Sequence, residues 1–131
     1  MTARSPAGDA VQPLVLIVDD YEQNRKLARD VLRAAGLRTV EAATGAEAIS
    51  LAVARVPDVI LMDLRLPDMV GTEVARVLAE DTRTAAIPVV ALSSVPLGER
   101  RGLPFVGSLE KPIVVGDFPD QVRRYCVGVE S

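Results

Sequence analysis

Two adjacent carboxylates, Asp19 and Asp20, follow directly on a strongly apolar segment. The stretch LVLIVDDYEQNRKL, residues 14–27, runs five apolar residues straight into this pair. Like charges at the edge of a core repel one another and lose hydration, so they are costly unless a cation or hydrogen-bond donors compensate. A cost of this kind indicates a functional site.

Three further polar residues stand at the ends of similar segments. Asp63 closes the run DVILMD, 43 positions after Asp20, while Ser93 closes VVALS and Lys111 lies in SLEKP. The chain contains no histidine, which excludes His-based metal sites, His general bases and a phosphohistidine carried by the chain itself. Its chemistry must therefore use carboxylates, hydroxyls and lysine.

Length and composition predict one folded domain. The chain has 131 residues, of which 49% are hydrophobic and 25% charged, as is usual for a globular protein. We expect a flexible N-terminal tail over 1–13, the domain over 14–127 and a short C-terminal tail over 128–131. The net charge of -3 and the scattered arginines argue against direct contact with nucleic acid.

The chain shows no signal for secretion or for crossing a membrane. No run of about 18 apolar residues occurs, and the N-terminus has no continuous apolar stretch. The single cysteine, Cys126, excludes an internal disulfide framework and fits a reducing compartment. These features predict a cytoplasmic protein in which Cys126 is a small buried hydrophobe.

Short apolar runs alternate with amphipathic segments along the chain. The apolar runs predict strands over 14–18, 37–42, 58–63, 87–94 and 105–109. Predicted helices begin at Glu22, at Thr44 with a capping-box pattern, after Gly71, and near Asp117. This alternation is typical of βαβ units, so we expect a doubly wound (βα)5 fold with a five-stranded parallel sheet.

The expected topology brings the polar residues together. In open α/β sheets, ligands bind beyond the carboxyl ends of the strands. Each of the five polar residues ends or follows a predicted strand. We therefore expect them to converge on one edge of the sheet.

In this order, the motifs IVDD, LMDLRLPDMVG, IPVVALSS and EKP resemble those of the receiver domains of two-component response regulators. The likeness covers roughly residues 14–127, and DDYEQNRKLARDVL also resembles receivers found in phosphorelays, in hybrid kinases and in single-domain regulators of the DivK type. It implies a flavodoxin-like sheet with the strand order 2-1-3-4-5.

The resemblance implies that Asp63 is the phosphoacceptor, a carboxylate nucleophile that becomes an acyl phosphate. Oxygen ligands from Asp20, Asp63 and the backbone carbonyl of Arg65 would hold Mg²⁺, or Mn²⁺ in its place. Asp19 would act on the metal mainly through a bound water.

The remaining two polar residues would contact the phosphoryl group. Lys111 would pair with a phosphoryl oxygen, or with Asp63 at rest, and the Ser93 hydroxyl would donate to another oxygen. Asn24 and Arg25 are expected to be surface residues. For the Arg65 side chain, screening of the site and plain solvent exposure both remain open.

The resemblance also implies partners. A histidine kinase, a histidine phosphotransfer protein or both would supply the phosphoryl group, and phosphorylation would switch binding to an output protein. The chain would catalyse its own phosphotransfer and dephosphorylation without being a classical enzyme. We expect a monomer or weak dimer that binds neither nucleic acid nor membrane.

The chain departs from the family pattern between the fourth and fifth strands. Only 17 residues separate Ser93 from Lys111, about one helical turn fewer than is usual, so the fourth helix should be short or irregular. Ser108 stands where the family commonly has a switching aromatic residue, and Phe105 is poorly placed to replace it. Signal coupling should therefore be atypical, and the loop from Ser93 to Leu97 is the expected responding element.

Three other functions share parts of this pattern. An aspartyl phosphohydrolase would need a second acid two residues after Asp63, where this chain has Arg65. A flavin mononucleotide binder would need a phosphate loop in place of the acidic DDYEQN. A pseudo-receiver that signals without phosphorylation remains the main alternative.

Overall fold

The computed structural model describes residues 12–93, 105–111 and 113–126. The segment from 94 to 104, where we expected a short or irregular fourth helix and the responding loop, lies outside the described residues. The predicted tails, 1–13 and 128–131, lie outside them except for residues 12 and 13.

Five parallel strands form a single sheet in the order β2-β1-β3-β4-β5, which confirms the predicted fold class and strand order. The fourth and fifth strands each begin two residues later than predicted. The strands are β1 Leu14–Val18, β2 Arg38–Ala42, β3 Val59–Asp63, β4 Val89–Ser93 and β5 Gly107–Glu110.

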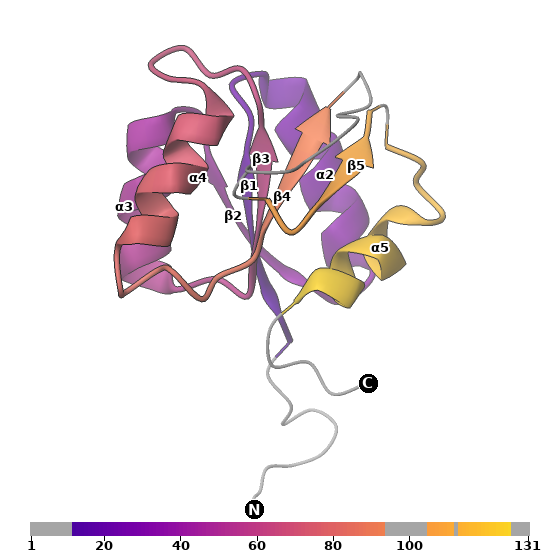
Figure 1. The fold of residues 1–131 in the computed structure, drawn as a ribbon. Helices are drawn as coiled ribbons and strands as arrows, with labels where there is room; N and C mark the ends of the chain where they lie inside the picture. The colour runs from indigo at the N-terminus through magenta and orange to yellow at the C-terminus, as the bar shows by residue number, and fades with distance from the viewer. Residues whose placement is uncertain (1–11, 94–104, 112, 127–131) are drawn as a thin grey trace, which may run out of the picture.

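Helices cover both faces of the sheet (Figure 1). Helices α3 and α4 lie on one face, and α2 and α5 lie on the other. In the part of the chain that the structure describes, the helices are α2 Glu22–Ala34, α3 Gly45–Arg55, α4 Gly71–Glu80 and α5 Phe118–Tyr125.

Apart from Asp63 and Ser93 at their carboxyl ends, the central strands are apolar, and both of their faces are buried. In β1, Leu16 and Val18 pack toward α3 and α4, while Val15 and Ile17 pack toward α2 and α5. All five residues of β1 are buried. A two-sided core of this kind explains why the central strands read as continuous hydrophobic runs rather than as alternating patterns.

The helix ends follow the sequence signals. The Thr44 side chain accepts a hydrogen bond from the backbone N–H of Glu47, and the Glu47 carboxylate accepts one from the N–H of Ala43. These bonds confirm the predicted start of α3. Gly36 ends α2 with a φ of +93°, a left-handed conformation that glycine adopts without strain.

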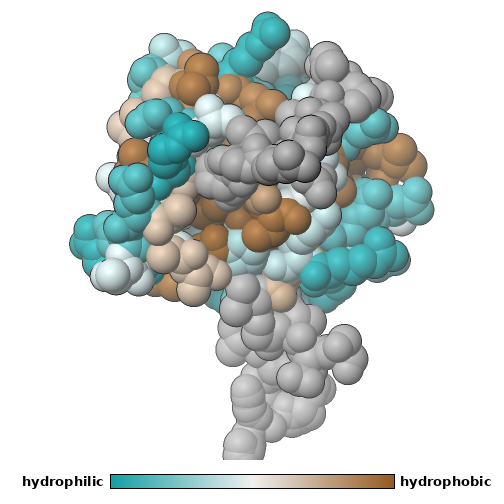
Figure 2. Space-filling model, viewed as in Figure 1, coloured by the Kyte–Doolittle hydropathy of each residue, from teal (hydrophilic) through white to brown (hydrophobic). Residues whose placement is uncertain are grey.

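The surface is mixed in character. Figure 2 shows hydrophobic side chains near the middle of one face, where β5 begins, and hydrophilic side chains over α5.

Cys126 is only partly buried, so the expectation of a buried cysteine is wrong. None of the helices within the described ranges is long and apolar enough to cross a bilayer.

Candidate functional site

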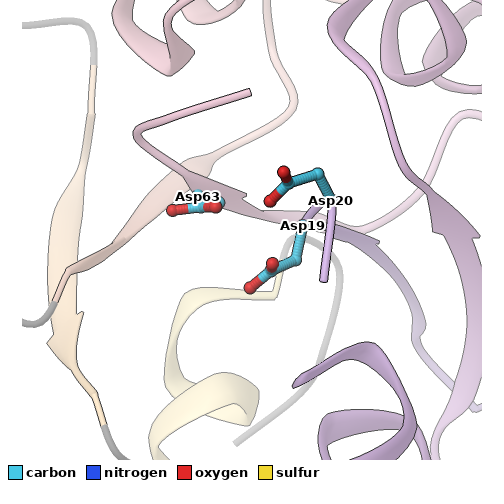
Figure 3. Close-up of side chains that lie close together, drawn as sticks. All are labelled: Asp19, Asp20 and Asp63. Atoms are coloured by element: carbon cyan, nitrogen blue, oxygen red, sulfur yellow. The ribbon is translucent and has the colours of Figure 1, made fainter. Parts of the chain in front are cut away.

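The carboxyl ends of β1 and β3 bring three carboxylates together. The parallel register pairs Val18, the last residue of β1, with Met62 of β3. The residues that follow them, Asp19 and Asp63, therefore lie side by side. Asp20 follows directly. One oxygen from each of Asp19, Asp20 and Asp63 lies within 4.8 Å of the others, and Figure 3 shows the three side chains close together.

Lys111 supplies the positive charge of this acidic cluster. Its Nζ lies 3.0 Å from Oδ2 of Asp19 and 3.4 Å from Oδ1 of Asp63. The Lys111 side chain is 22% exposed, and its backbone N–H donates to the carbonyl of Ser93 at 2.8 Å. That backbone bond fixes the position of Lys111 directly after β5. The Lys111 side chain then reaches across the sheet edge to Asp19, which follows β1.

Asp19 is the most enclosed carboxylate of the cluster, with a side chain only 2% exposed. Besides Lys111, it accepts hydrogen bonds from the N–H of Tyr21 at 2.9 Å and from Nδ2 of Asn24 at 3.1 Å. These donors give both oxygens of the buried Asp19 carboxylate a hydrogen-bond partner. Asp20, in contrast, is exposed.

Arg25 holds the backbone at Asp19. Its Nη1 donates to the carbonyl of Asp19 at 2.7 Å, and its Nε pairs with Glu41 of β2 at 3.2 Å. Asn24 and Arg25 are thus partly buried in contact with Asp19, so their prediction as plain surface residues is wrong. Side chains in the first turn of α2 point back toward the end of β1, which brings Asn24 and Arg25 to Asp19.

The electrostatic setting of Asp63 disfavours its charge. Burial raises the pKa of the Asp63 carboxyl above its ordinary value, the Lys111 ammonium opposes this shift, and the Asp19 charge adds to it. An additional cation near Asp63 would therefore stabilise the ionised cluster. All three carboxylates offer hard oxygen ligands, which suit Mg²⁺.

The chain after Asp63 forms a closed loop, residues 64–70. The N–H of Gly71 donates to the carbonyl of Leu64 at 2.8 Å, and Arg65 forms a β-bridge with Val70. A Cβ at position 71 would overlap the carbonyl oxygen of Asp63, which explains the glycine there. The Arg65 side chain is exposed, and metal coordination by its carbonyl remains a prediction.

Ser93 and Ser108 lie on neighbouring strands. Ser93 is the last residue of β4, one position after the partner of Asp63, and its side chain is partly buried. Ser108 pairs with Ala91 in the middle of β5. The strand end thus brings Ser93 to the same sheet edge as the acidic cluster, while its contact with a phosphoryl group remains a prediction.

Sequence reasoning also missed Asp68. Its carboxylate accepts hydrogen bonds from the backbone N–H groups of Gly45 at 2.8 Å and Ala46 at 3.0 Å, the first residues of α3. The bonds join residues 23 and 22 positions apart, so no local pattern in the sequence indicates them.

Comparisons with known proteins agree with this geometry. The family model of the response regulator receiver domain matches residues 15–100. The polar-differentiation response regulator DivK of Brucella ovis is 37% identical over 115 residues, covering 85% of this chain and 94% of its own.

Solved structures give the same result. The chemotaxis response regulator CheY4 of Vibrio cholerae superimposes with a TM-score of 0.81 at 26% identity, over 87% of this chain and 98% of its own. The receiver domain of the sensor histidine kinase PA1611 of Pseudomonas aeruginosa, solved with magnesium coordinated in its active-site cleft, gives a TM-score of 0.78 at 26% identity. That match covers 87% of this chain and 97% of the PA1611 domain.

Proposed function

The chain belongs to the receiver domains of two-component response regulators, and from this premise we propose that Asp63 is its phosphoacceptor. The observation that carries the proposal is the placement of Asp63 between two further carboxylates and Lys111 at the carboxyl edge of the sheet. Receiver domains act in signalling rather than as classical enzymes.

The transfer step is a displacement at phosphorus. A carboxylate oxygen of Asp63 attacks the phosphorus of a phosphohistidine, the P–N bond breaks, and the donor imidazole leaves with the bonding electron pair. The product is an acyl phosphate. Water later attacks the same phosphorus, which releases inorganic phosphate and regenerates the Asp63 carboxylate.

Both reactants are anions, so the step needs positive charge. Receiver domains generally bind Mg²⁺ at an acidic site, and here the carboxylates of Asp20 and Asp63, with the carbonyl of Arg65, would hold it directly. When bound, this ion supplies charge neutralisation for the phosphoryl oxygens. Asp19, fully engaged by protein donors, would take part through a water.

Two side chains of the protein would bind the phosphoryl oxygens. Lys111 already lies 3.4 Å from Asp63, and we infer that it exchanges this contact for a phosphoryl oxygen. Ser93, at the end of β4, would donate its hydroxyl to a second oxygen. The Asp63 side chain is 15% exposed, which leaves it open to an approaching donor.

The partners follow from this chemistry. A histidine kinase or a histidine phosphotransfer protein would be the donor, and an output protein would distinguish the phosphorylated state from the free state. This exchange would take place in the cytoplasm. The atypical residue Ser108 suggests a coupling that does not use an aromatic switch.

Incubation with Mg²⁺ and acetyl phosphate, followed by intact mass measurement, tests the proposal. We expect one phosphoryl adduct that hydroxylamine removes, since acyl phosphates are labile to this nucleophile. Asp63→Asn must abolish the adduct. Chelation of the metal with EDTA must also prevent it.

The control is Asp120→Asn, which removes an exposed carboxylate in α5 and should leave the adduct unchanged. An adduct that persists in Asp63→Asn would refute the acceptor assignment. No adduct in the parent protein would favour a pseudo-receiver that signals without phosphorylation.

A further inference from the structure

The loop after Asp63, residues 64–70, is held both at its base and at its tip. At its base, the Gly71 N–H bonds the Leu64 carbonyl, and Arg65 bridges to Val70. At its far end, Asp68 bonds the first turn of α3. Figure 1 shows this connection between β3 and α4 arching over the ends of the helix pair α3 and α4.

The Asp68 side chain is exposed, yet its carboxylate accepts two hydrogen bonds from one helix end. Its carboxylate binds two backbone N–H groups at the positive end of the α3 dipole, and charge-assisted hydrogen bonds are roughly twice as strong as neutral ones. The bonds from Gly45 and Ala46 lower the pKa of Asp68, so the group remains ionised at neutral pH.

Packing reinforces the same contact. A Cβ on Gly45 would lie 2.6 Å from Cγ of Met69 and 2.8 Å from Cγ2 of Val74, so the side chains of Met69 and Val74 would have to shift to admit a larger residue. The α3 N-terminus, the loop and α4 therefore meet without space between them. The loop can shift relative to α3 only by breaking the Asp68 bonds.

We propose that Asp68 is a positioning residue, whose bonds to α3 hold the backbone of Arg65 in place beside Asp63 for metal binding and phosphoryl transfer. Arg65 lies at the base of the loop, three residues before Asp68, and its N–H points to Oδ1 of Asp63 at 3.4 Å. The inference rests on the proposed function, because that function assigns the Arg65 carbonyl to the metal.

A purely structural role for Asp68 makes a different prediction. If Asp68 served only as a cap for α3, any loss of capping at that helix would have the same consequences. Thr44→Ala is the matched control, since it removes another cap bond of the same helix, to the Glu47 N–H at 3.1 Å, without touching the loop.

The experiment compares the parent protein with Asp68→Ala, Asp68→Asn and Thr44→Ala. Three quantities are measured: the stability to urea, the hydrogen exchange of the Arg65 amide without metal, and the Mg²⁺ affinity by titration. We expect Asp68→Ala to speed exchange at Arg65 and to weaken Mg²⁺ binding about tenfold, as loss of a supporting contact typically does. Asp68→Asn, which keeps one acceptor oxygen, should lie between Asp68→Ala and the parent.

Thr44→Ala should lower stability by a similar amount and leave both the exchange at Arg65 and the Mg²⁺ affinity at parent values. Equal effects of Asp68→Ala and Thr44→Ala on those two readouts would overturn the inference, as would parent-like values in Asp68→Ala. Failure of the proposed function would appear separately, as a parent protein that takes no phosphoryl group. Exchange at Arg65 decides the positioning role even then.

Discussion

Asp20→Asn should make the metal-free protein more stable while removing its response to Mg²⁺. The substitution keeps the shape of the side chain and removes one negative charge from the acidic cluster. Because the oxygens of the cluster lie within 4.8 Å of one another, the charge of Asp20 is repelled by both Asp19 and Asp63. Its removal relieves that repulsion.

The expected gain follows from Coulomb's law. Two unit charges 4.8 Å apart repel by about 1 kcal/mol in water and about 3 kcal/mol at an effective dielectric constant of 20. Asp20 is exposed, so the lower figure applies to each of its two carboxylate neighbours. Attraction to Lys111, which contacts Asp19 and Asp63, and to the α2 N-terminus offsets part of this repulsion, so we expect a net gain of about 0.5–1 kcal/mol.

Mg²⁺ should make the parent protein more stable than Asp20→Asn. A ligand that binds only the folded state at ten times its Kd stabilises that state by about 1.4 kcal/mol. The parent should show this gain in Mg²⁺, whereas Asp20→Asn, lacking a proposed ligand, should show little or none. Urea unfolding in EDTA and in MgCl₂ measures both effects.

Asp120→Asn is the control for this pair of measurements. It also removes an acidic residue near a helix N-terminus, that of α5, but outside the acidic cluster. We expect a loss of a few tenths of a kcal/mol and an unchanged response to Mg²⁺. If Asp20→Asn is less stable than the parent in EDTA, or gains as much from Mg²⁺, the charge argument is wrong.

Three further perturbations test the electrostatics. Lys111→Met leaves Asp19 and Asp63 without their cation, so stability at pH 7 should fall by about 1–3 kcal/mol and the loss should shrink at pH 4, as measured by urea unfolding; an equal loss at both pH values would contradict this. Burial raises the pKa of the Cys126 thiol to about 11, so its alkylation by iodoacetamide at pH 8 should be slower than that of a free thiol by roughly 100-fold and should speed up in urea. The side chain of Arg83 lowers the pKa of Asp81 to about 2, below its unfolded value near 4, so its stabilisation is present above pH 4 and is lost as the pH falls toward 2. Asp81→Asn should therefore flatten the acid limb of a stability curve between these values, and an unchanged limb would count against the ion pair.

The fold could be predicted because its central strands are buried on both faces. Continuous apolar runs such as 14–18 and 59–63 have few alternatives in a chain with short connections. The edge strand β5 was placed two residues too early because Phe105, although buried, precedes the paired segment. Ile87 is likewise buried but precedes β4, which was also placed two residues too early, so buried apolar residues beside a strand obscure its start.

Only the site residues that stand at the ends of strands could be predicted from the sequence. The rule that polar residues gather at the carboxyl ends of parallel strands brings Asp19, Asp63 and Lys111 together without knowledge of any side-chain contact. Asn24, Arg25 and Asp68 were missed for one physical reason. Their partners are fixed by how neighbouring elements pack, and neither periodicity nor a turn signal in the sequence reports that geometry.

The acidic cluster carries more negative than positive charge, and residues that contact helices on both faces of the sheet hold it together. Three carboxylates face a single ammonium, that of Lys111, so two negative charges stay without a protein cation among the described residues. Arg25 does not neutralise the cluster, because it bonds the carbonyl of Asp19 and its charge pairs with Glu41. Repulsion would drive the carboxylates apart unless the backbone held them. Helix α2 holds Asp19 through Asn24 and Arg25, and we infer that α3 holds the chain after Asp63 through Asp68. The excess of two negative charges matches the charge of one divalent cation, so we infer that these supports hold the carboxylates close together for the proposed metal ion.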